Sequence, residues 1–470
     1  MHGWFDDLFE APTESRLPII GREILGEVLA RVSLTAPADT SRVEIADDQG
    51  RRSADRMVLS PGTVSKAVKV LLDRQLLEVG TTHLQSATGR AVAPLRLGSN
   101  WIVVGVKLEH YDLEPVSITT VLINLNGNVL RQRKPKRLPR AKAPDENVWP
   151  QIAEAMAREI LATKEEEDAS RAREGRPAAQ MLGVGVEVAA HVFNGEVVLA
   201  AYSPGSSSVP LSRPLEKLLP WPVVVENDVN ALAVWATHSR KYEGTNMVLA
   251  AVFDQGVGGG LVMDGRLRRG GHGMAMEIGH LLVEPHTTAP DQNTPAPHAP
   301  SEYGFSDPCW CKTYGHVDVL ATPSRIRAEL GVSTLREAIS APSTGSDGNP
   351  TREYRVFHRA GTGLGRGLAD AITIVNPKEL ILKLPPELTD PPSDAAASAY
   401  LKALKQEIST VFSTGATDAE LTIEPLHDVA VTGACAAAIC VIDTFIEHAR
   451  GLDDCPPPRR NQDLERTDQT

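Results

Sequence analysis

Between Trp101 and Arg450, short apolar segments alternate with longer segments in which apolar residues recur at helical spacing. Strands are expected at 101–108, 117–130, 181–188, 222–225, 247–253, 260–264, 379–384 and 421–426, and helices at 146–163, 226–240, 355–376, 396–413 and 431–450. Such alternation is typical of the α/β fold class. The charged segment 164–178 is expected to form a surface excursion, and 286–307 a flexible insertion.

The composition excludes several classes of protein. The chain has 470 residues, of which 42% are hydrophobic and 23% charged, as expected for a globular protein of about three domains. No apolar run of the length that a membrane-spanning helix needs is expected, and the acidic N-terminus does not resemble a secretory signal. Five cysteines are too few for a disulfide scaffold, so we expect a cytoplasmic protein without a membrane partner.

The pattern at 18–98 predicts a winged helix-turn-helix. A helix at 18–33, a loop at 34–52 and a short helix at 53–58 precede a longer helix, which begins at Pro61 and is capped by Ser60. A strand at 76–79, a turn at 80–89 and a return strand at 91–97 complete a β-hairpin. The segments 1–17 and 451–470 are expected to be disordered tails.

The charge distribution indicates a DNA-facing module. The net charge is −12, yet residues 51–96 contain eight Lys or Arg and three Asp or Glu, a local balance of +5. A recognition helix presents short polar and basic side chains to the bases. The candidate DNA-binding residues are therefore Ser60, Thr63, Ser65, Lys66 and Lys69 on the helix, Arg56 before it and Arg90 in the wing. The alternative is an interdomain helix with solvated lysines.

Four motifs resemble those of the ROK family, a group of bacterial sugar-responsive repressors and sugar kinases. They are TVSKAVKVLLDRQLLEVG (63–80) with TGR (88–90), ENDVNA (226–231), GVGGGLVMDGRLRRG (256–270), and MEIGH (276–280) with CWCKTYGHVD (309–318). The resemblance covers roughly residues 18–450 and is to the repressor branch that responds to N-acetylglucosamine or xylose. It implies two actin-like (ribonuclease H-like, ASKHA) α/β lobes, at 99–231 and 232–450, with a zinc segment at 277–318 and a sugar in the cleft.

The resemblance also implies a structural zinc ion held by one His and three Cys. His280, Cys309 and Cys311 match three of these positions, and His316 stands where the family has the last Cys. Imidazole is a normal zinc ligand, so a site with two Cys and two His is expected. The alternative is a decayed site with two free thiols.

Asn227, Asp228, Glu277 and His280 line the sugar pocket if the resemblance holds, and Asp318 stands where the family has Glu. Carboxylates and amides suit a polyhydroxylated ligand. Asp228 could also cap the helix that follows it. The family's earlier sugar loop is poorly kept, because Glu187-Val188 replaces its Pro-Gly pair.

The phosphate-binding elements of the family's kinases are altered in this chain. Lys107 replaces the Asp of the first phosphate turn, Asp254-Gln255 replaces Gly-Thr in the second, and Lys383-Leu384 replaces a Gly-Gly pair. We therefore expect that the chain does not phosphorylate sugar, with Asp228 as a vestigial base. Lys107 also suggests the hypothesis that this cation holds a sugar phosphate.

These inferences predict a sugar-responsive DNA-binding transcriptional regulator, a repressor of carbohydrate metabolism genes. Its expected partners are double-stranded operator DNA and a sugar or sugar-phosphate effector, and its expected cofactor is zinc. One winged helix binds weakly, so a homodimer or homotetramer that contacts two half-sites is expected. The alternatives are an active ATP-dependent sugar kinase that carries a DNA module, and a DNA-binding protein that responds to no ligand.

Overall fold

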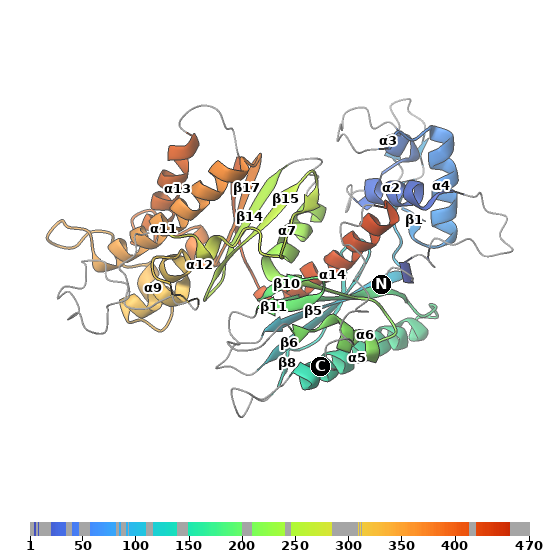
Figure 1. Ribbon diagram of the computed structural model, residues 1–470, viewed down its shortest axis with the longest axis horizontal. Helices are drawn as coiled ribbons and strands as arrows, with labels where there is room; N and C mark the ends of the chain where they lie inside the picture. Colours follow the sequence, from blue (N-terminus) through green and yellow to red (C-terminus); the bar gives the residue numbers. More distant parts are fainter. Residues whose placement is uncertain are drawn as a thin grey trace, which may run out of the picture.

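The computed structural model arranges the chain in three parts around one apolar helix. It describes residues 4–5, 8, 20–33, 40–46, 57–80, 84–85, 91–92, 94–109, 116–138, 149–199, 209–239, 246–283, 309, 311, 313–412 and 420–451. Figure 1 shows a blue N-terminal module, a teal and green sheet with its helices, and a yellow to orange sheet with its helices. The red helix α14 (Val429–Ala449) lies between the blue module and the teal sheet.

The first sheet is mixed. It contains β5 (Trp101–Glu109), β6 (Ser117–Asn124), β7 (Val129–Gln132), β8 (Lys136–Arg137), β9 (Gln180–Val188) and β13 (Val223–Asn227). The described strands have the order β13-β9-β5-β6-β7, with β8 beside β6. Strands β9 and β13 run parallel to β5, whereas β6 and β7 form an antiparallel meander. One face packs on α5 (Trp149–Arg173) and α6 (Ser212–Leu218), and the other packs on α14.

The second sheet repeats this topology. It contains β14 (Met247–Val252), β15 (Val257–Met263), β16 (Arg266–Leu267), β17 (Glu379–Leu384) and β18 (Glu420–Pro425), in the order β16-β15-β14-β17-β18. Again an antiparallel meander lies on one side of the first strand and parallel strands lie on the other. Helices α11 (Arg352–Val375) and α13 (Ser398–Phe412) cover one face, and α7 (Asp228–Ser239) covers the other. The two predicted α/β lobes are therefore confirmed.

Shorter elements complete the two lobes. Strands β10 (His191–Phe193), β11 (Glu196–Leu199) and β12 (Val209–Pro210) form a small antiparallel sheet after β9. The 3-10 helix η1 (Ile278–His280) and helices α8 (Asp318–Ala321), α9 (Pro323–Leu330), α10 (Arg336–Ile339) and α12 (Pro386–Thr389) belong to the second lobe.

Two glycines seat α14 against the first sheet. Gly105 of β5 and Gly185 of β9 are partners in the parallel ladder. A Cβ atom on Gly105 would lie 1.8 Å from the Ala434 carbonyl oxygen, and one on Gly185 would lie 1.9 Å from that of Ala437. Since any side chain would need this space, the helix backbone can approach the sheet so closely only over glycine.

Helix α14 corrects the expectation that no segment could span a membrane. It is 21 residues long, and its most apolar 18-residue stretch has a mean hydropathy of 2.1, enough for a membrane span by length and composition. In this fold it is a core helix, buried against β5, β6 and β9. The predicted boundary at residue 231 placed this helix with the second lobe, whereas in the structure it packs on the first sheet and also contacts α7 and α2.

The N-terminal module follows the predicted order of elements, with one helix displaced. It contains α2 (Arg22–Ser33), α3 (Arg42–Ala46) and α4 (Pro61–Asp73), then β1 (Leu77–Val79), β2 (Leu84–Gln85), β3 (Ala91–Val92) and β4 (Leu95–Leu97). Strand β1 pairs with β4, and β2 with β3. The short helix lies within the predicted loop at 34–52, and Met57 and Val58, expected to be helical, are not. The reason is a capping box: the Ser41 amide donates to Glu44 Oε2 at 2.8 Å, and the Glu44 amide donates to Ser41 Oγ at 3.2 Å.

The predicted surface excursion at 164–178 is largely helical. Helix α5 continues to Arg173 because its charged residues find partners at helical spacing and across the sheet. Glu167 accepts from Arg171 Nε at 2.9 Å and from Arg131 Nε at 2.8 Å.

Phe5 departs from the predicted N-terminal tail, since it is buried edge-on against Phe445 of α14, with ring centroids 5.3 Å apart.

Helix α2 contacts the ends of both central helices, α7 and α14. A Cβ on Gly26 would lie 2.5 Å from the Ala449 carbonyl carbon, so the two helix backbones touch there. Next to this contact, Arg450 Nε donates to Glu27 Oε2 at 3.0 Å. At the C-terminal end of α2, Ser33 Oγ lies 3.2 Å from His238 Nδ1 of α7. The N-terminal module is thus joined to helices that pack on different sheets.

We predict that Gly105→Ala lowers the free energy of unfolding by about 1–3 kcal/mol, because the added methyl group overpacks the α14 interface. Thermal and urea denaturation measure the change. Gly271→Ala is the matched control, since a Cβ there meets no atom within 4 Å. Equal stability of the two variants would contradict the close contact.

Candidate functional site

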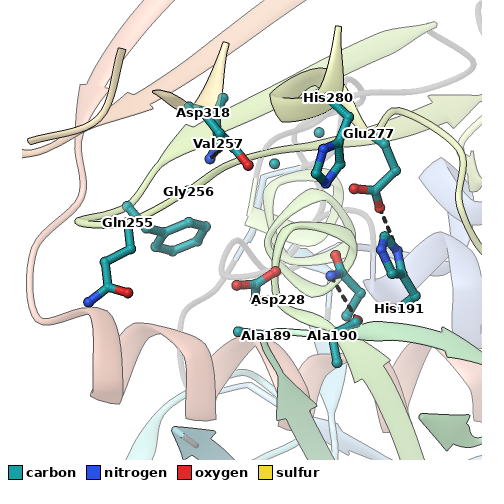
Figure 2. A pocket seen from close by; sticks show the side chains of 14 residues that line it. Ala189, Ala190, His191, Asp228, Gln255, Gly256, Val257, Glu277, His280 and Asp318 are labelled. Atoms are coloured by element: carbon teal, nitrogen blue, oxygen red, sulfur yellow. Dashed lines mark hydrogen bonds and ion pairs between the residues drawn. The ribbon is translucent and has the colours of Figure 1, made fainter. Parts of the chain in front are cut away.

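A pocket opens where the parallel strands β9 and β13 of the first sheet end (Figure 2). Ligand sites in α/β proteins favour this edge. The β9–β10 connection supplies Ala189 and Ala190, β10 supplies His191, and the first sheet and α7 meet at Asn227 and Asp228. The second lobe supplies the other lining residues, Phe253, Gln255, Gly256, Val257, Gly258, Gly259, Glu277, His280 and Asp318.

Asn227 and Asp228 have different roles at the start of α7. The Asn227 Oδ1 accepts from the amides of Val229 and Asn230 at 3.0 and 3.1 Å, so Asn227 caps the helix. Asp228 also accepts from the Val229 amide, at 2.9 Å, and its second carboxylate oxygen is not needed for the cap. Burial raises the pKa of Asp228, while the Lys107 ammonium opposes this rise. Asp228 is thus a buried acceptor that faces the pocket.

Glu277 and His191 meet across the pocket from different lobes. The Glu277 Oε1 lies 2.9 Å from His191 Nδ1 (Figure 2). Glu277 precedes η1 in the second lobe, and His191 begins β10 of the first lobe. Sequence reasoning missed His191, although a histidine three residues after a buried strand could have signalled it. The pair links the two walls of the pocket.

Asp318 borders the pocket at the start of α8. Its Oδ1 accepts from the Val257 amide at 2.7 Å, and burial raises the pKa of its carboxyl group to about 7. The neighbouring turn carries Asp254, which the sequence placed beside a phosphate-binding turn. Arg327 holds the Asp254 carboxylate with two hydrogen bonds, at 2.5 and 2.9 Å.

Lys107 and Glu187 form a buried ion pair beneath the pocket. The Lys107 Nζ donates to Glu187 Oε1 at 2.6 Å, and both side chains are at most 2% exposed. The Lys107 ammonium also lies 5.7 Å from the centre of the Phe253 ring. Glu187 Oε2 has no hydrogen-bond partner among the described residues, and burial raises the pKa of this carboxyl group to about 7. The Lys107 ammonium, which suggested a sugar-phosphate site, is therefore paired with a carboxylate of its own chain.

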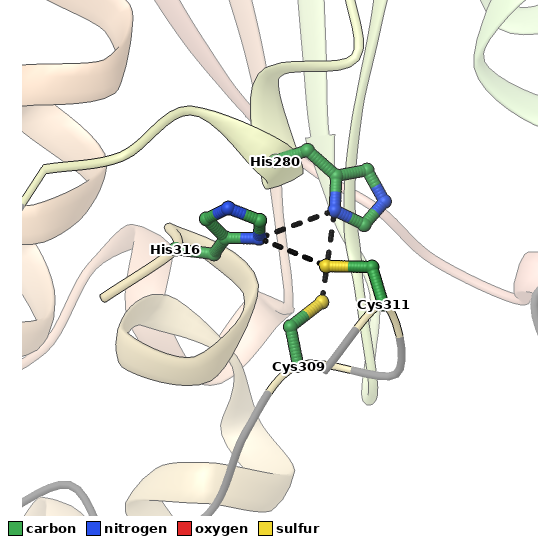
Figure 3. A group of neighbouring side chains, drawn as sticks. All are labelled: His280, Cys309, Cys311 and His316. Carbon is green, nitrogen blue, oxygen red and sulfur yellow. Dashed lines mark hydrogen bonds between the residues drawn. The ribbon is translucent and has the colours of Figure 1, made fainter. Parts of the chain in front are cut away.

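Four side chains behind the pocket form a cluster of metal-ligand type (Figure 3). The Nδ1 atoms of His280 and His316 are 3.3 Å apart. Cys309 Sγ lies 3.6 Å from His280 Nδ1, and Cys311 Sγ lies 3.5 Å from His316 Nδ1. A tetrahedral ion with bonds of about 2.05 Å to nitrogen and about 2.3 Å to sulfur has N–N edges of about 3.3 Å and N–S edges of about 3.6 Å. The cluster therefore fits an ion of this size.

Burial acts in opposite directions on the pKa values of two members of the cluster. Burial lowers the pKa of His280, which keeps its imidazole neutral and able to act as a ligand. Burial raises the pKa of the Cys309 thiol to about 12, so a bound cation is what would release its proton. His280 belongs to both sites, since its ring lines the pocket while its Nδ1 faces the cluster (Figures 2 and 3).

The predicted site residues fall into three groups. The five expected in the pocket line it together, and the four expected metal ligands lie within 4.8 Å of one another. On α4, Ser60, Ser65, Lys66 and Lys69 are exposed and Thr63 is half-buried, whereas Val64, Ala67 and Val68 are buried. Ser60 caps the helix as predicted, with Thr63 N–H donating to its Oγ at 3.1 Å. Arg56 and Arg90 lie outside the described residues.

Paired sheets of like topology with a pocket at the strand ends define a protein of the actin-like, two-lobed class. The comparisons with known proteins then give the family. The ROK family model matches residues 116–438, and the chain belongs to the ROK family.

Relatives of this chain include kinases and a regulator. The chain is 25% identical over 224 residues to a glucokinase of Halalkalibacterium halodurans, covering 43% of this chain and 61% of the glucokinase. It is 30% identical over 167 residues to an N-acetylmannosamine kinase of Escherichia coli, covering 34% of this chain and 48% of that kinase. The chain thus spans about half to three-fifths of the length of these relatives.

Two solved structures show the same fold. A ROK family transcriptional regulator, described as a homologue of the E. coli MLC protein, is 18% identical and covers 91% of this chain and 98% of its own, with a TM-score of 0.58. A ROK hexokinase from Thermus thermophilus is 22% identical and covers 73% of this chain and 99% of its own, with a TM-score of 0.50. The likeness to the regulator therefore extends over more of the chain.

Proposed function

We propose that this protein is a sugar-responsive, DNA-binding transcriptional regulator, a repressor that does not phosphorylate sugar. Residues 18–98 form a winged helix-turn-helix, and the pocket between the lobes takes the effector. The protein acts in the cytoplasm as a homodimer or homotetramer, because two DNA modules are needed to contact two half-sites. The observation that carries this proposal is the joint between α2 and the helices α7 and α14.

The joint links the pocket to the DNA module by two routes. Helix α7 begins at Asp228 in the pocket and ends beside Ser33 of α2, where His238 also lies 2.9 Å from Asp443 of α14. Helix α14 passes the Lys107–Glu187 pair at Gly433, where a Cβ would lie 1.9 Å from Glu187 Oε2. It then reaches α2 at Ala449. A ligand that shifts either helix therefore displaces the DNA module.

The exposed face of α4 supports DNA binding. Lys66 and Lys69 project from the helix opposite its buried stripe, as a recognition helix requires. The more extensive likeness to a regulator structure agrees with an N-terminal module of this kind.

The phosphate end of the pocket supports the absence of kinase activity. Phosphoryl transfer needs a carboxylate or hydroxyl to hold Mg²⁺ against the polyphosphate. The equivalent position holds Lys107, and its ion pair with Glu187 fills the buried space beneath it. The surviving Asp228 and the kinase relatives favour the alternative, an active sugar kinase with a DNA module.

We propose that the cluster of His280, Cys309, Cys311 and His316 holds a structural zinc ion. Two thiolates and two imidazoles are a common zinc ligand set, and their spacing suits its bond lengths. The ion supplies a rigid link between η1 and the segment that leads to α8. That link positions Glu277 and Asp318 around the pocket.

We predict that Lys66→Ala and Lys69→Ala each weaken DNA binding and reduce the slope of log affinity against log salt by about one, because each removes a phosphate contact. Fluorescence anisotropy on a duplex selected from a random pool measures both quantities. Lys405→Ala, at an exposed position of α13, is the control. Binding by the α4 variants that matches the control would refute our placement of the recognition helix.

Purified protein is expected to contain about one equivalent of zinc per chain. Cys309→Ser should lose the metal and melt at a lower temperature, because only three of the four ligands of a structural zinc site remain. Metal analysis and thermal denaturation give the two readouts. The control is Cys435→Ser, a buried thiol of α14 outside the cluster, which should keep its zinc. A wild-type protein without metal would rule out the zinc site.

Incubation with MgATP and a panel of hexoses should give no turnover above that of Asp228→Asn. The physical reason is that the described phosphate-binding positions carry Lys107 and a paired Asp254. A coupled ADP assay measures the rate. Turnover by the wild type that the Asp228→Asn variant lacks would establish the kinase alternative.

A further inference from the structure

We infer that the pocket selects an unphosphorylated sugar and discriminates against the corresponding sugar phosphate. This inference rests on the proposed function, since it names the chemical class of the effector. It also replaces the hypothesis, suggested by Lys107 in the sequence, that this cation holds a sugar phosphate. The charges around the pocket carry the argument.

The described lining of the pocket is acidic. It contains the carboxyl groups of Asp228, Glu277 and Asp318, and none of its described residues is Lys or Arg. Sugar hydroxyl groups donate hydrogen bonds well to carboxylates, whereas a phosphate brings only acceptors and further negative charge. A phosphate placed here would lose its hydration and find no Lys or Arg among the described lining residues, and the two histidines of the lining already contact Glu277 and the cysteine–histidine cluster.

Three of the described cations near the pocket are each bonded to an acid of the protein. Lys107 is buried and bonded to Glu187, Arg327 is bonded to both oxygens of Asp254, and Arg269 is bonded to Glu226 at 2.7 Å. Arg325 borders a neighbouring hollow together with Asp318 and Gln255, and its charge acts on the Asp318 carboxylate. A phosphate would have to break one of these pairs and leave a carboxylate without its cation, which is unfavourable in a buried site.

The Lys107–Glu187 pair is the specificity determinant that the structure adds. Without Glu187, the Lys107 ammonium would be a buried cation close to Asp228 and to the pocket, able to attract an anion. With Glu187 in place, the Lys107 ammonium is bonded to a carboxylate of the protein at 2.6 Å, and the pair carries no net charge. Glu187 therefore determines which form of a sugar is accepted.

Calorimetry on the full-length protein tests the inference with D-glucose, N-acetyl-D-glucosamine and N-acetyl-D-mannosamine, each compared with its own 6-phosphate. At least one free sugar is expected to bind at least tenfold more tightly than its 6-phosphate. Equal or tighter binding of the 6-phosphates would overturn this inference and leave the sugar response intact. Binding of neither set would overturn the proposed sugar response, and this inference with it.

A variant tests the role assigned to Glu187. Glu187→Gln should narrow the ratio of free-sugar to 6-phosphate affinity by at least fivefold, since it removes the carboxylate that is bonded to the Lys107 ammonium. Glu424→Gln, which removes the carboxylate paired with Lys383 away from the pocket lining, is the matched control and should keep the wild-type ratio. An unchanged ratio in a folded Glu187→Gln protein would overturn the assignment. If that variant does not fold, the wild-type comparison decides alone.

Discussion

The close contact between α14 and the first sheet is the constraint on which the other features depend. Gly105 and Gly185 let the helix carbonyl groups lie where side chains would otherwise be. A helix of 21 residues is about 30 Å long and stiff. Its close contact with the two glycines therefore also fixes the positions of both of its ends. One end lies against the Lys107–Glu187 pair, and the other meets α2 of the N-terminal module. A substitution at either glycine would therefore disturb both the pocket and the N-terminal module.

The Lys107–Glu187 pair shows how two departures from a family pattern can be one physical change. In the sequence, Lys107 in the first phosphate turn and Glu187 in the sugar loop look like separate losses. In the structure their side chains are buried together, and either one alone would be an uncompensated buried charge. Gly433 provides the space, because a side chain there would collide with both. At the position of the first phosphate turn, this chain therefore has a packed ion pair whose charges balance.

Sequence patterns predicted the elements that rest on local signals. Helix α4 followed from its Ser60 cap and apolar stripe, and the ligand cluster followed from the resemblance of its motifs to those of the ROK family. Non-local partners decided the features that were missed. Helix α5 extends through a charged segment because Arg131 of β7 pairs with Glu167, and His191 enters the pocket because β9 and η1 converge there. The capping box at Ser41 was a local signal that could have placed α3.

The joint at α2 is made of contacts whose strength suits regulation. Helix α14 packs on the first sheet and α7 on the second, and the two helices also pack on each other, so a ligand that brought the lobes together would shift the helix ends that meet α2. The Glu27–Arg450 ion pair and the Ser33–His238 contact each join a buried side chain to a partly exposed one, and a typical hydrogen bond contributes about 0.5–1.5 kcal/mol net. A ligand with a preference of about 2 kcal/mol for one lobe arrangement could exchange them. The backbone contact between α2 and α14 at Gly26 is harder to break than these side-chain contacts. Helix α2 would therefore rotate about its contact with α14 while its C-terminal end moves away from α7.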